Sequence, residues 1–379
     1  MIRVLHVLGG LNLGGAETMV MNLYRAIDRT KIQFDFIIHL QEKQAYEDEV
    51  IALGGKIYRF PAFNGKSIIK QVRVWNEFFI SHKEYQILHS HVRSYASIYL
   101  PIAKKHGVYT IIHSHSTSNG RGILSWIKTL LQYPLRFQAD YFFACSFNAG
   151  KWLFGKRVVQ CNNFEVFPNA IDASLFDYNP DVRIRLRRKL EIEDKFVIGH
   201  VGRMTEPKNH KFLIEIFEKV EKKSKNAVLL LVGDGELRDK IEQCIYEKKL
   251  QEKIILVGNK INTQDYYQAM DVFAFPSLWE GLGIVAIEAQ TSGLPCIVSD
   301  GVPREVDLNM GLVTRVDIDN SDKWADEIMR YRGCTNSRHS YSEDVKKAGY
   351  DINMNVKKMQ AFYISNAERN FLDVYHEIR

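Results

Sequence analysis

The stretch PSLWEGLGIVAIEAQTSGLPCIVSD, residues 276–300, contains a glycine-rich turn, a helical run and an apolar segment in that order. Its last residues, PCIVSD (295–300), and the overlapping segment DVFAFPS (271–277) are short and apolar, which is typical of buried strands. Between them, IVAIEAQ (284–290) has no Gly or Pro and is predicted to be helical. A strand, a helix and another strand in succession predict a parallel sheet covered by helices.

The same alternation extends through most of the chain. We expect a first series of strands at 3–8, 34–40, 56–60, 86–91, 110–115 and 140–146, and a second at 196–202, 227–235, 253–258, 271–277 and 295–300. Because 379 residues are too many for one ordinary core, we predict two doubly wound, Rossmann-like α/β domains. Pro-Asn and Asn-Pro turns near 168–180 mark their join, so the domains are placed at 1–170 and 171–365.

Composition is that of an ordinary soluble globular protein, with 46% hydrophobic and 25% charged residues. The sequence has no apolar run of about 18 residues, so no segment is expected to span a membrane. The N-terminal MIRVLHVLGG is too short in its apolar part for a secretory signal. Five cysteines at scattered spacing show no disulfide or zinc pattern, which favours a cytoplasmic location.

Positive charge is concentrated in the N-terminal part of the chain. Residues 1–168 hold 20 Lys+Arg and 11 Asp+Glu, whereas residues 169–379 hold 31 and 34. An anionic partner, such as a membrane surface or a phosphorylated acceptor, is therefore expected at the first domain; a nucleic-acid partner is not. The segment 121–137 mixes aromatic and aliphatic residues with Arg121, Lys128 and Arg136. It could lie on a membrane, but a helix packed on its sheet is the favoured interpretation.

Ligands of doubly wound sheets bind beyond the carboxyl ends of the strands, and the polar clusters of this sequence lie there. GGLNLGGAE (9–17) follows the first strand, and Gly14 and Gly15 would let a helix start approach an anion. The spacing is not GxGxxG, although Asp35 stands about where a dinucleotide fold keeps its ribose acid. A dehydrogenase is thus conceivable but disfavoured.

Two cations and two carboxylates lie at such ends in the second domain. Arg203 and Lys208, in GRMTEPKNH (202–210), suit a diphosphate. Glu280, in the glycine-rich turn just before Gly281, could bind sugar hydroxyls, and Glu288, near a helix start, should stay ionised and accept hydrogen bonds from a ribose diol. A glycosidase with paired carboxylates is the alternative, but it would not need Arg203 and Lys208.

Histidines end two neighbouring strands of the first domain, in HSH at 89–91 and HSHS at 113–116. Ligand spacing gives a zinc site little support, and hydrogen bonds to a sugar or acceptor fit these positions better. Asp317-Ile318-Asp319 is a DxD sequence, but it lies far from the other motifs and is interpreted as a solvated turn. We therefore expect no metal and no cofactor, with positive charge from Arg203, Lys208 and helix starts in place of a cation.

Together these motifs resemble the family 4 retaining glycosyltransferases of the GT-B fold. The resemblance is carried by LGGAE (13–17), FPNAID (167–172), GRMTEPKNH (202–210), LVGDGELRDKIE (231–242) and the stretch 276–300, which contains the family's Glu-x7-Glu pattern. KNHKFLIEIF (208–217) and DGVPREV (300–306) resemble the capsular and exopolysaccharide branch. Ala170 stands where Gly is usual, Leu282 where Phe is frequent, and HSH where His-Asp is common.

The resemblance implies a role for each matching position. Gly15 would touch the donor diphosphate, Arg203 and Lys208 the leaving phosphates, and Glu288 the ribose. Glu280, with Gly281, Leu282 and Gly283, would hold the donor sugar, and His115 would lie beside it. The strip from Val257 to Lys260, with Gly258 and Asn259, would border the base. Further substrate contacts are expected from the positions Gly14, His91, Asn169 and Gly233. The C-terminal helix, about 366–379, would return to the first domain.

The resemblance implies an enzyme that moves a hexose or N-acetylhexosamine from a nucleotide-diphosphate sugar, with UDP the expected nucleotide, to a saccharide or lipid-linked saccharide. We expect the enzyme to act in the cytoplasm at the inner face of the cell membrane, because the basic first domain would be attracted to an anionic membrane surface. A non-hydrolysing nucleotide-sugar epimerase and a non-catalytic nucleotide-sugar-binding protein stay open as alternatives. The sequence leaves open the sugar, the acceptor and the oligomeric state.

Overall fold

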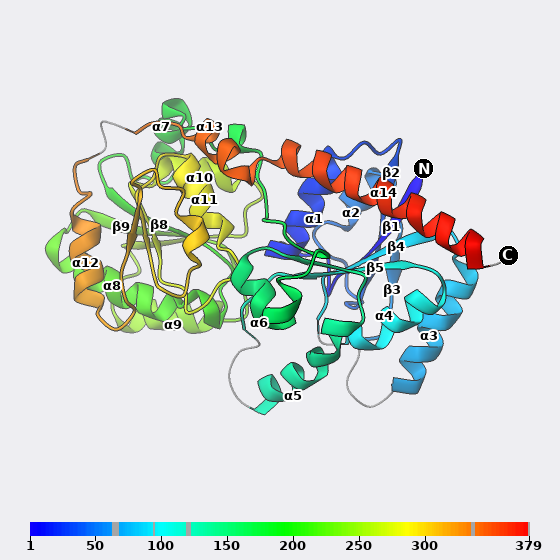
Figure 1. Ribbon diagram of the computed structural model, residues 1–379. Helices are drawn as coiled ribbons and strands as arrows, with labels where there is room; N and C mark the ends of the chain where they lie inside the picture. The colour runs from blue at the N-terminus through cyan, green and yellow to red at the C-terminus, as the bar shows by residue number, and fades with distance from the viewer. Residues whose placement is uncertain (63–67, 94, 119–122, 335–337, 378–379) are drawn as a thin grey trace. The chain divides into compact units, whose positions relative to one another are not determined.

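The computed structural model of the chain describes residues 1–62, 68–93, 95–118, 123–334 and 338–377 (Figure 1). The chain forms two compact units, one of Met1–Ala170 with Ile352–Arg379 and one of Ile171–Asp351. The return to the first unit begins at Ile352, earlier than the position near Asn366 expected from the sequence.

The first unit is built on a parallel sheet of seven strands in the order β3-β2-β1-β4-β5-β6-β7. Its strands are β1 (Ile2–Val7), β2 (Ile32–Ile38), β3 (Ile57–Arg59), β4 (Tyr85–Ser90), β5 (Tyr109–Ser114), β6 (Tyr141–Ala144) and β7 (Phe164–Val166). Alternate residues face two cores: Val4 belongs to one cluster and Leu5 to the other. Such strands are buried on both faces, which is why they are continuous apolar runs in the sequence.

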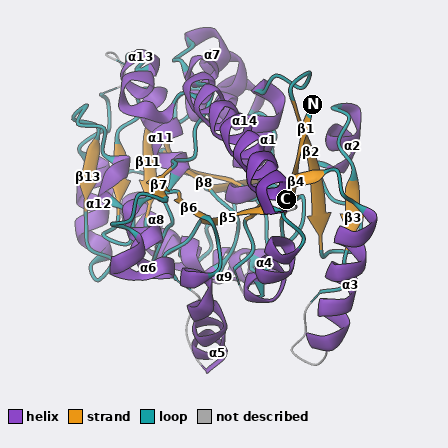
Figure 2. Ribbon diagram, turned by 45° about the vertical axis from the view of Figure 1, so that its right-hand side comes forward, coloured by secondary structure: helices purple, strands orange, loops and turns teal. Residues whose placement is uncertain are grey.

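Helices cover both faces of this sheet (Figure 2). They are α1 (Gly15–Ala26), α2 (Glu47–Ala52), α3 (Ile68–Ser81), α4 (Ala96–Lys105), α5 (Ile123–Gln132), α6 (Phe147–Val158) and α14 (Ile352–Glu377). Val20 of α1 and Met359 of α14 share the core cluster that contains Val4. Trp75 of α3, Tyr99 of α4 and Phe154 of α6 belong to the cluster that contains Leu5.

Helix α14 is held on the first unit by polar contacts as well as apolar ones. Asn355 donates through Nδ2 to the carbonyl of Pro168 at 3.0 Å, and the Tyr363 hydroxyl lies 2.7 Å from Nδ1 of His89. Tyr363 is fully buried, so this contact reaches the strands from the last helix of the chain.

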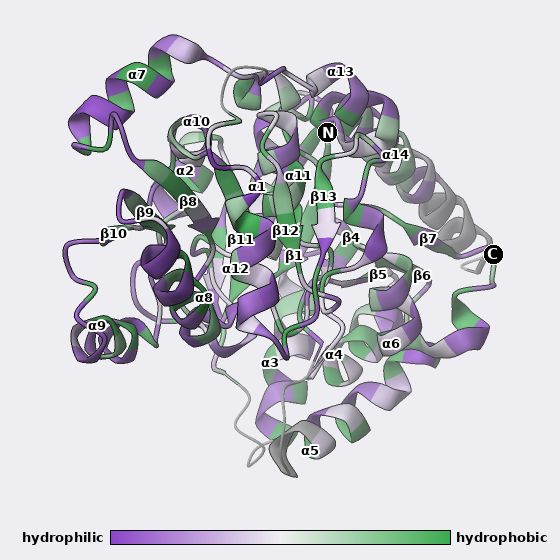
Figure 3. Ribbon diagram, turned by 90° about the vertical axis from the view of Figure 1, so that its left-hand side faces the viewer, coloured by the Kyte–Doolittle hydropathy of each residue, from purple (hydrophilic) through white to green (hydrophobic). Residues whose placement is uncertain are grey.

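The second unit repeats the architecture with six parallel strands in the order β10-β9-β8-β11-β12-β13. The strands are β8 (Phe196–Val201), β9 (Ala227–Val232), β10 (Ile254–Gly258), β11 (Val272–Phe275), β12 (Cys296–Val298) and β13 (Val313–Arg315). The helices are α7 (Pro180–Lys189), α8 (His210–Lys223), α9 (Arg238–Glu247), α10 (Thr263–Ala269), α11 (Ile284–Thr291), α12 (Ser321–Met329) and α13 (Ser342–Val345). Figure 3 shows hydrophobic residues on the strands and mixed colours on helices such as α8.

The strand–helix–strand prediction made from residues 276–300 is confirmed as β11, α11 and β12.

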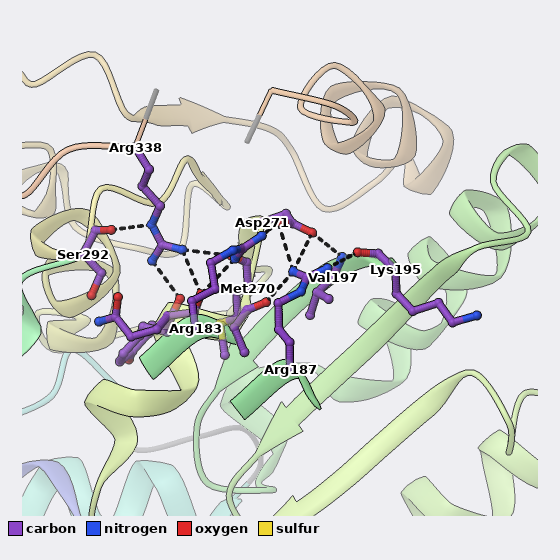
Figure 4. A network of polar contacts seen from close by, with 11 residues as sticks. Arg183, Arg187, Lys195, Val197, Met270, Asp271, Ser292 and Arg338 are labelled. Carbon is purple, nitrogen blue, oxygen red and sulfur yellow. Dashed lines mark hydrogen bonds and ion pairs between the residues drawn. The ribbon is translucent and has the colours of Figure 1, made fainter. Parts of the chain in front are cut away.

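Three guanidinium groups surround the C-terminal end of α10 (Figure 4). Arg183 donates to the carbonyls of Gln268 and Met270, both at 2.8 Å, and Arg338 donates to Tyr267 O at 2.8 Å. Arg187 donates to Ala269 O at 2.9 Å. The last carbonyls of a helix have no partner within it, so these donors satisfy them and fix where α10 ends. Burial lowers the pKa of Arg338 to about 9.

Helix α5 differs from the favoured sequence interpretation. Instead of packing its apolar side chains on the sheet, it exposes them: Trp126 is 79% and Leu130 76% exposed. The following 3-10 turn (Tyr133–Phe137) leaves Phe137 75% exposed. Figure 1 shows α5 projecting from the first unit. Arg121 lies outside the described residues. Within the part of the chain that the structure describes, no helix is long and apolar enough to cross a membrane.

Candidate functional site

Each sheet reverses its strand order at one place, between β1 and β4 in the first unit and between β8 and β11 in the second. Adjacent strand ends at such a switch point leave a crevice, which is where doubly wound proteins bind ligands. The loops after these strands carry most of the residues predicted from the sequence.

In the second unit the structure brings Lys208 and Glu280 together. Lys208 lies in a 3-10 turn after β8, and its Nζ is 2.7 Å from Oε1 of Glu280 in the loop after β11. Both side chains are largely buried, with 17% and 12% exposed. The ammonium also lies 4.8 Å from the centre of the Phe275 ring. A cation held by a carboxylate and an aromatic face keeps its charge and position ready for an anion.

The backbone fixes these two loops against each other. Leu278 N donates to Pro207 O at 2.7 Å, and Asn209 Nδ2 donates to Pro276 O at 3.1 Å. Asn209 adopts a left-handed conformation with φ 55°, which Asn tolerates better than most residues. The Lys208–Glu280 pair therefore rests on a cross-linked loop pair. Arg203 lies in the same loop after β8 and is exposed.

Glycines let the neighbouring loops approach each other closely. A Cβ on Gly233 would lie 2.1 Å from Gly202 O, and Gly233 has φ 136°. Gly233 N donates to Gly258 O at 2.9 Å, so the loops after β8, β9 and β10 are joined through their backbones. Asn259, which is exposed, and Lys260 follow Gly258 at this edge.

The glycine-rich turn ends where α11 begins. Gly283 is the N-cap of α11 with φ 89°, and a Cβ there would lie 3.1 Å from the Phe275 ring. Gly281 and Gly283 are buried and Leu282 is only 3% exposed, so the Leu282 side chain belongs to the core. The first N–H groups of a helix have no intrahelical acceptor, which leaves the start of α11 suited to an anion.

Glu288 differs from the sequence expectation in its ionisation. It lies in the second turn of α11, past the first turn in which the helix dipole acts, and its Oε2 accepts a 2.6 Å hydrogen bond from the Tyr267 hydroxyl. Burial raises the pKa of Glu288 to about 7, while the Tyr267 hydrogen bond and the charge of Lys208 oppose that rise. The carboxyl is therefore partly protonated at neutral pH instead of permanently ionised.

Asp35 is not available for a ribose. It lies inside β2, fully buried, and its carboxylate accepts two hydrogen bonds from Arg3 at 2.6 Å and one from Tyr85 at 2.8 Å. The backbone N–H of Lys56 also donates to it, at 2.7 Å. Asp35 joins strands of the sheet, and the one feature that suggested a dehydrogenase has a structural role.

In the first unit, the loop after β1 meets the loop after β7. Gly14 is the N-cap of α1, and because glycine has no side chain it makes no side-chain cap hydrogen bond. Gly15 is exposed, and a Cβ there would meet no atom within 4 Å. Asn169 donates through Nδ2 to Gly15 O at 3.4 Å. Gly15 is thus open to a ligand, with Asn169 beside it, whereas the carboxylate of Glu17 lies against Gly14.

The predicted histidines separate into two kinds. His91 and His115 follow β4 and β5, and Nδ1 of His91 lies 2.8 Å from Nε2 of His115. His89 and His113 have no exposed surface, so they cannot contact a sugar as the sequence suggested. Two groups of three histidines have ring nitrogens within 4.8 Å of one another, His6 with His89 and His91, and His91 with His113 and His115. Each group offers three imidazole nitrogens and, among the described residues, no carboxylate.

Sequence reasoning missed three residues of these sites. Tyr267 bonds Glu288, Phe275 lies under Lys208, and His6 contacts His91. Only His6 could have been identified as a candidate from the sequence, because it is a polar residue inside the apolar run RVLHVL. The other two look like ordinary core residues, and their roles depend on contacts between elements.

Comparison with known proteins matches both halves of the chain to glycosyltransferase families. The model described as "Glycosyltransferase Family 4" matches residues 13–175, and "Glycosyl transferases group 1" matches residues 182–348. A Bacillus subtilis (strain 168) protein named as the glycosyltransferase EpsF is 34% identical over 376 residues, which cover 97% of this chain and 98% of that protein.

More distant similarities extend this result. The Escherichia coli UDP-Gal:alpha-D-GlcNAc-diphosphoundecaprenol alpha-1,3-galactosyltransferase is 27% identical over 229 residues, 58% of this chain and 59% of that protein. The solved structure of Anabaena Alr3699/HepE with UDP and glucose superposes with a TM-score of 0.79, covering 96% of this chain and 100% of that chain at 17% identity. That likeness shows the GT-B fold. The near full-length match to the Bacillus protein and the two family models establish that the chain belongs to glycosyltransferase family 4 and is a retaining glycosyltransferase of the GT-B fold.

Proposed function

We propose that this enzyme transfers a hexose or N-acetylhexosamine from a UDP-sugar to a saccharide or lipid-linked saccharide during capsule or exopolysaccharide synthesis. A structure of HepE in complex with UDP-glucose supports the donor class, with a TM-score of 0.77. The name of the E. coli relative supports a diphosphoundecaprenol-linked acceptor. A Staphylococcus aureus relative named as the capsular polysaccharide biosynthesis glycosyltransferase CapH is 22% identical and covers 96% of this chain.

The observation that carries the proposal is the Lys208–Glu280 ion pair at the β8/β11 switch point. The pair has no net charge, and each ion holds the other in place when no ligand is bound. A diphosphate would attract Lys208 and release Glu280 to accept hydrogen bonds from hydroxyls of the donor sugar. Arg203 would add a second positive charge in the same loop. One ion pair thus links binding of the leaving group to binding of the transferred sugar.

The reaction then needs little covalent chemistry from the protein. The bond between the sugar's anomeric carbon and the diphosphate oxygen breaks, and the acceptor hydroxyl bonds to that carbon on the same face. The acceptor's proton passes to the departing phosphate oxygen, so UDP leaves with the charge balanced. Arg203, Lys208 and the start of α11 stabilise the charge that develops on the diphosphate. We propose that these groups act in place of a metal ion and that no cofactor takes part.

Other residues take supporting roles in this proposal. Gly14 and Gly15 admit the diphosphate to the start of α1, with Asn169 beside them, and His115 contacts the transferred sugar, with His91 behind it. Glu288 binds the ribose, and the strip of Gly258, Asn259 and Lys260, with Gly233 behind it, borders the base. Positions at strand ends support these assignments for all of them but Glu288, which lies in α11.

We further propose that the first unit contacts an anionic membrane through α5 and the turn that follows it. Trp126, Leu130 and Phe137 are each at least 75% exposed, and Lys128 is exposed beside them. Exposed apolar clusters of this kind are rare on monomers that do not bind another surface. Apolar insertion together with attraction of Lys to anionic headgroups would hold the enzyme near a lipid-linked acceptor.

The test is a matrix of nucleotide sugars and acceptors with UDP release and product linkage as readouts. We expect UDP release from one UDP-sugar that depends on a diphosphoundecaprenol-linked saccharide, with retained anomeric configuration. Conversion of the donor to an epimer with no acceptor present would favour the epimerase alternative. Tight donor binding without UDP release in any pairing would favour a binding protein, and both results would contradict the proposal.

A further inference from the structure

Five imidazoles gather at the carboxyl ends of β1, β4 and β5 in the first unit. His6 pairs in register with His89 on the neighbouring strand, and both are fully buried, as is His113. His91 and His115 come just after the strand ends. Neither the proposed function nor the family assignment gives a role to His6.

Three of these rings form a hydrogen-bonded chain. His6 Nδ1 lies 3.0 Å from His91 Nε2, and His91 Nδ1 lies 2.8 Å from His115 Nε2. The ring centres are 5.3 and 5.1 Å apart in these two pairs. In each pair, the separation of the ring centres equals the nitrogen–nitrogen distance plus the distance from each ring centre to its own nitrogen. Such a sum is reached only when the two nitrogens lie on the line between the ring centres. Both contacts are therefore end-to-end hydrogen bonds and not face-to-face stacks.

Such a chain couples the states of its ends. A neutral imidazole has one N–H and one lone pair, and His91 uses both nitrogens, so it must donate to one neighbour and accept from the other. Burial lowers the pKa of His6 and of His115 to about 3, with Arg93 adding to the effect at His115, and burial lowers the pKa of His91 as well. All three rings are then neutral at physiological pH, and the protons of both hydrogen bonds point the same way along the chain.

The surroundings of His6 set that direction. Its Nε2 is buried and has no hydrogen-bond partner among the described residues, and its ring lies 4.2 Å from the Phe34 ring and 5.7 Å from that of Phe36. Aromatic faces are negative, so they tolerate an N–H better than a second lone pair. With the proton of His6 on Nε2, His91 Nε2–H donates to His6 Nδ1, and His115 Nε2–H donates to His91 Nδ1.

The other end of the chain is Nδ1 of His115, which is also buried without a partner among the described residues. We infer that His6 and His91 are positioning residues that hold His115 in one orientation and one tautomer, with its Nδ1 bare as a hydrogen-bond acceptor. The His115 ring is partly exposed while Nδ1 itself is covered, so a hydroxyl of the transferred sugar would donate to Nδ1 once the side chains that cover it move. The inference rests on the proposed function for its substrate, but the tautomer itself can be measured without one.

The experiment is nitrogen-15 NMR of the full-length protein labelled at histidine, with kcat and KM for the same variants. In the wild type we expect His115 with a bare Nδ1 and a protonated Nε2. His6→Phe should let His115 populate both tautomers and lower kcat about tenfold, the effect of losing one neutral hydrogen bond, with little change in KM. His6→Asn keeps an acceptor near the Nδ1 position and should restore most of both signals.

The matched control is His113→Phe. In the wild type the His113 ring stacks on His115 with ring centres 4.2 Å apart, and the variant keeps a ring there but removes nitrogens that take no part in the chain. It should leave the His115 tautomer unchanged. If His6→Phe does not fold, His91→Phe and His6→Asn carry the same comparison. Unchanged His115 tautomers in His6→Phe, a protonated Nδ1 in the wild type, or one tightly bound transition metal per purified chain would each overturn the inference. Loss of transferase activity in every assay, with the tautomer response intact, would instead count against the proposed function.

Discussion

The hydroxyl of Tyr267 donates to Oε2 of Glu288 at 2.6 Å and so ties the second glutamate of the stretch 276–300 to the end of α10. The three guanidinium groups around the carbonyls of α10 fix the position of Tyr267 in turn. Glu288 is partly exposed and has a pKa of about 7, so loss of its one fixed donor should change its charge at neutral pH.

Tyr267→Phe should shift the pH dependence of donor binding upward. The Tyr267 hydrogen bond favours the ionised form of Glu288, so its removal raises the pKa of Glu288 further above about 7. Donor binding that needs the carboxylate would then require a higher pH. Thermal stabilisation by UDP-sugars, measured from pH 6 to about 9, gives the profile. Identical profiles in wild type and variant would show that Glu288 does not bind the donor as a carboxylate.

Glu288→Gln should stabilise the ligand-free protein at high pH. The folded pKa of about 7 lies above the ordinary value of 4.5, so the folded state binds the proton more tightly and loses stability as pH rises between these values. Above pH 7 the variant should be more stable to unfolding by up to about 3 kcal/mol, and the difference should disappear at acid pH. Denaturant unfolding at several pH values measures it, and a constant difference would contradict the raised pKa.

Lys208→Met should lower kcat about 100- to 1000-fold, because it removes a charge that stabilises the departing diphosphate. Glu280 is only 12% exposed, so the loss of its partner should also lower stability, and thermal unfolding of the variant checks that it is folded at the assay temperature. Lys222→Met is the matched control: its ion pair with Glu218 spans 2.8 Å but is exposed, and it should change neither activity nor stability measurably. Equal activity of the two variants would remove Lys208 from the mechanism.

Chelation should leave the enzyme active. If Arg203, Lys208 and helix starts replace a cation, dialysis against EDTA and assay without added metal should preserve kcat and KM within error. Arg203→Ala with Lys208→Met should then abolish transfer with or without magnesium. Full loss of activity after chelation, with recovery on adding a divalent metal, would contradict the metal-independent proposal.

Trp126→Glu should weaken binding to phosphatidylglycerol vesicles about tenfold or more, since it replaces a buried apolar contact in the bilayer interface by a repelled charge. Binding by the wild type should fall with added salt. Ile184→Glu, at a site of the second unit that is 55% exposed, is the matched control and should bind like wild type. Vesicle sedimentation measures both, and equal binding of the two variants would show that α5 is not the membrane contact.

The sequence by itself determined the two sheets and the carboxyl ends of most of their strands, whereas β7 and β13 lay outside the predicted series. Apolar period and glycine-rich turns are local properties, and parallel strands place all their carboxyl ends at one edge. The sequence pattern therefore places Lys208, Glu280, Gly233 and Gly258 at one edge of one unit.

Only the tertiary structure decided which of those residues meet and in which state. The Lys208–Glu280, His6–His91 and His89–Tyr363 contacts join residues 72, 85 and 274 positions apart, and no local pattern encodes such pairs. Burial likewise depends on what packs over a residue. Asp35 is fully buried and links strands, and desolvation raises the pKa of Glu288, whereas no other element in the described part of the chain covers the side chain of Trp126. Desolvation and hydrogen bonding depend on which groups are close in space and not on which are close in the sequence. The ionisation and the partners of these groups therefore follow from the tertiary structure.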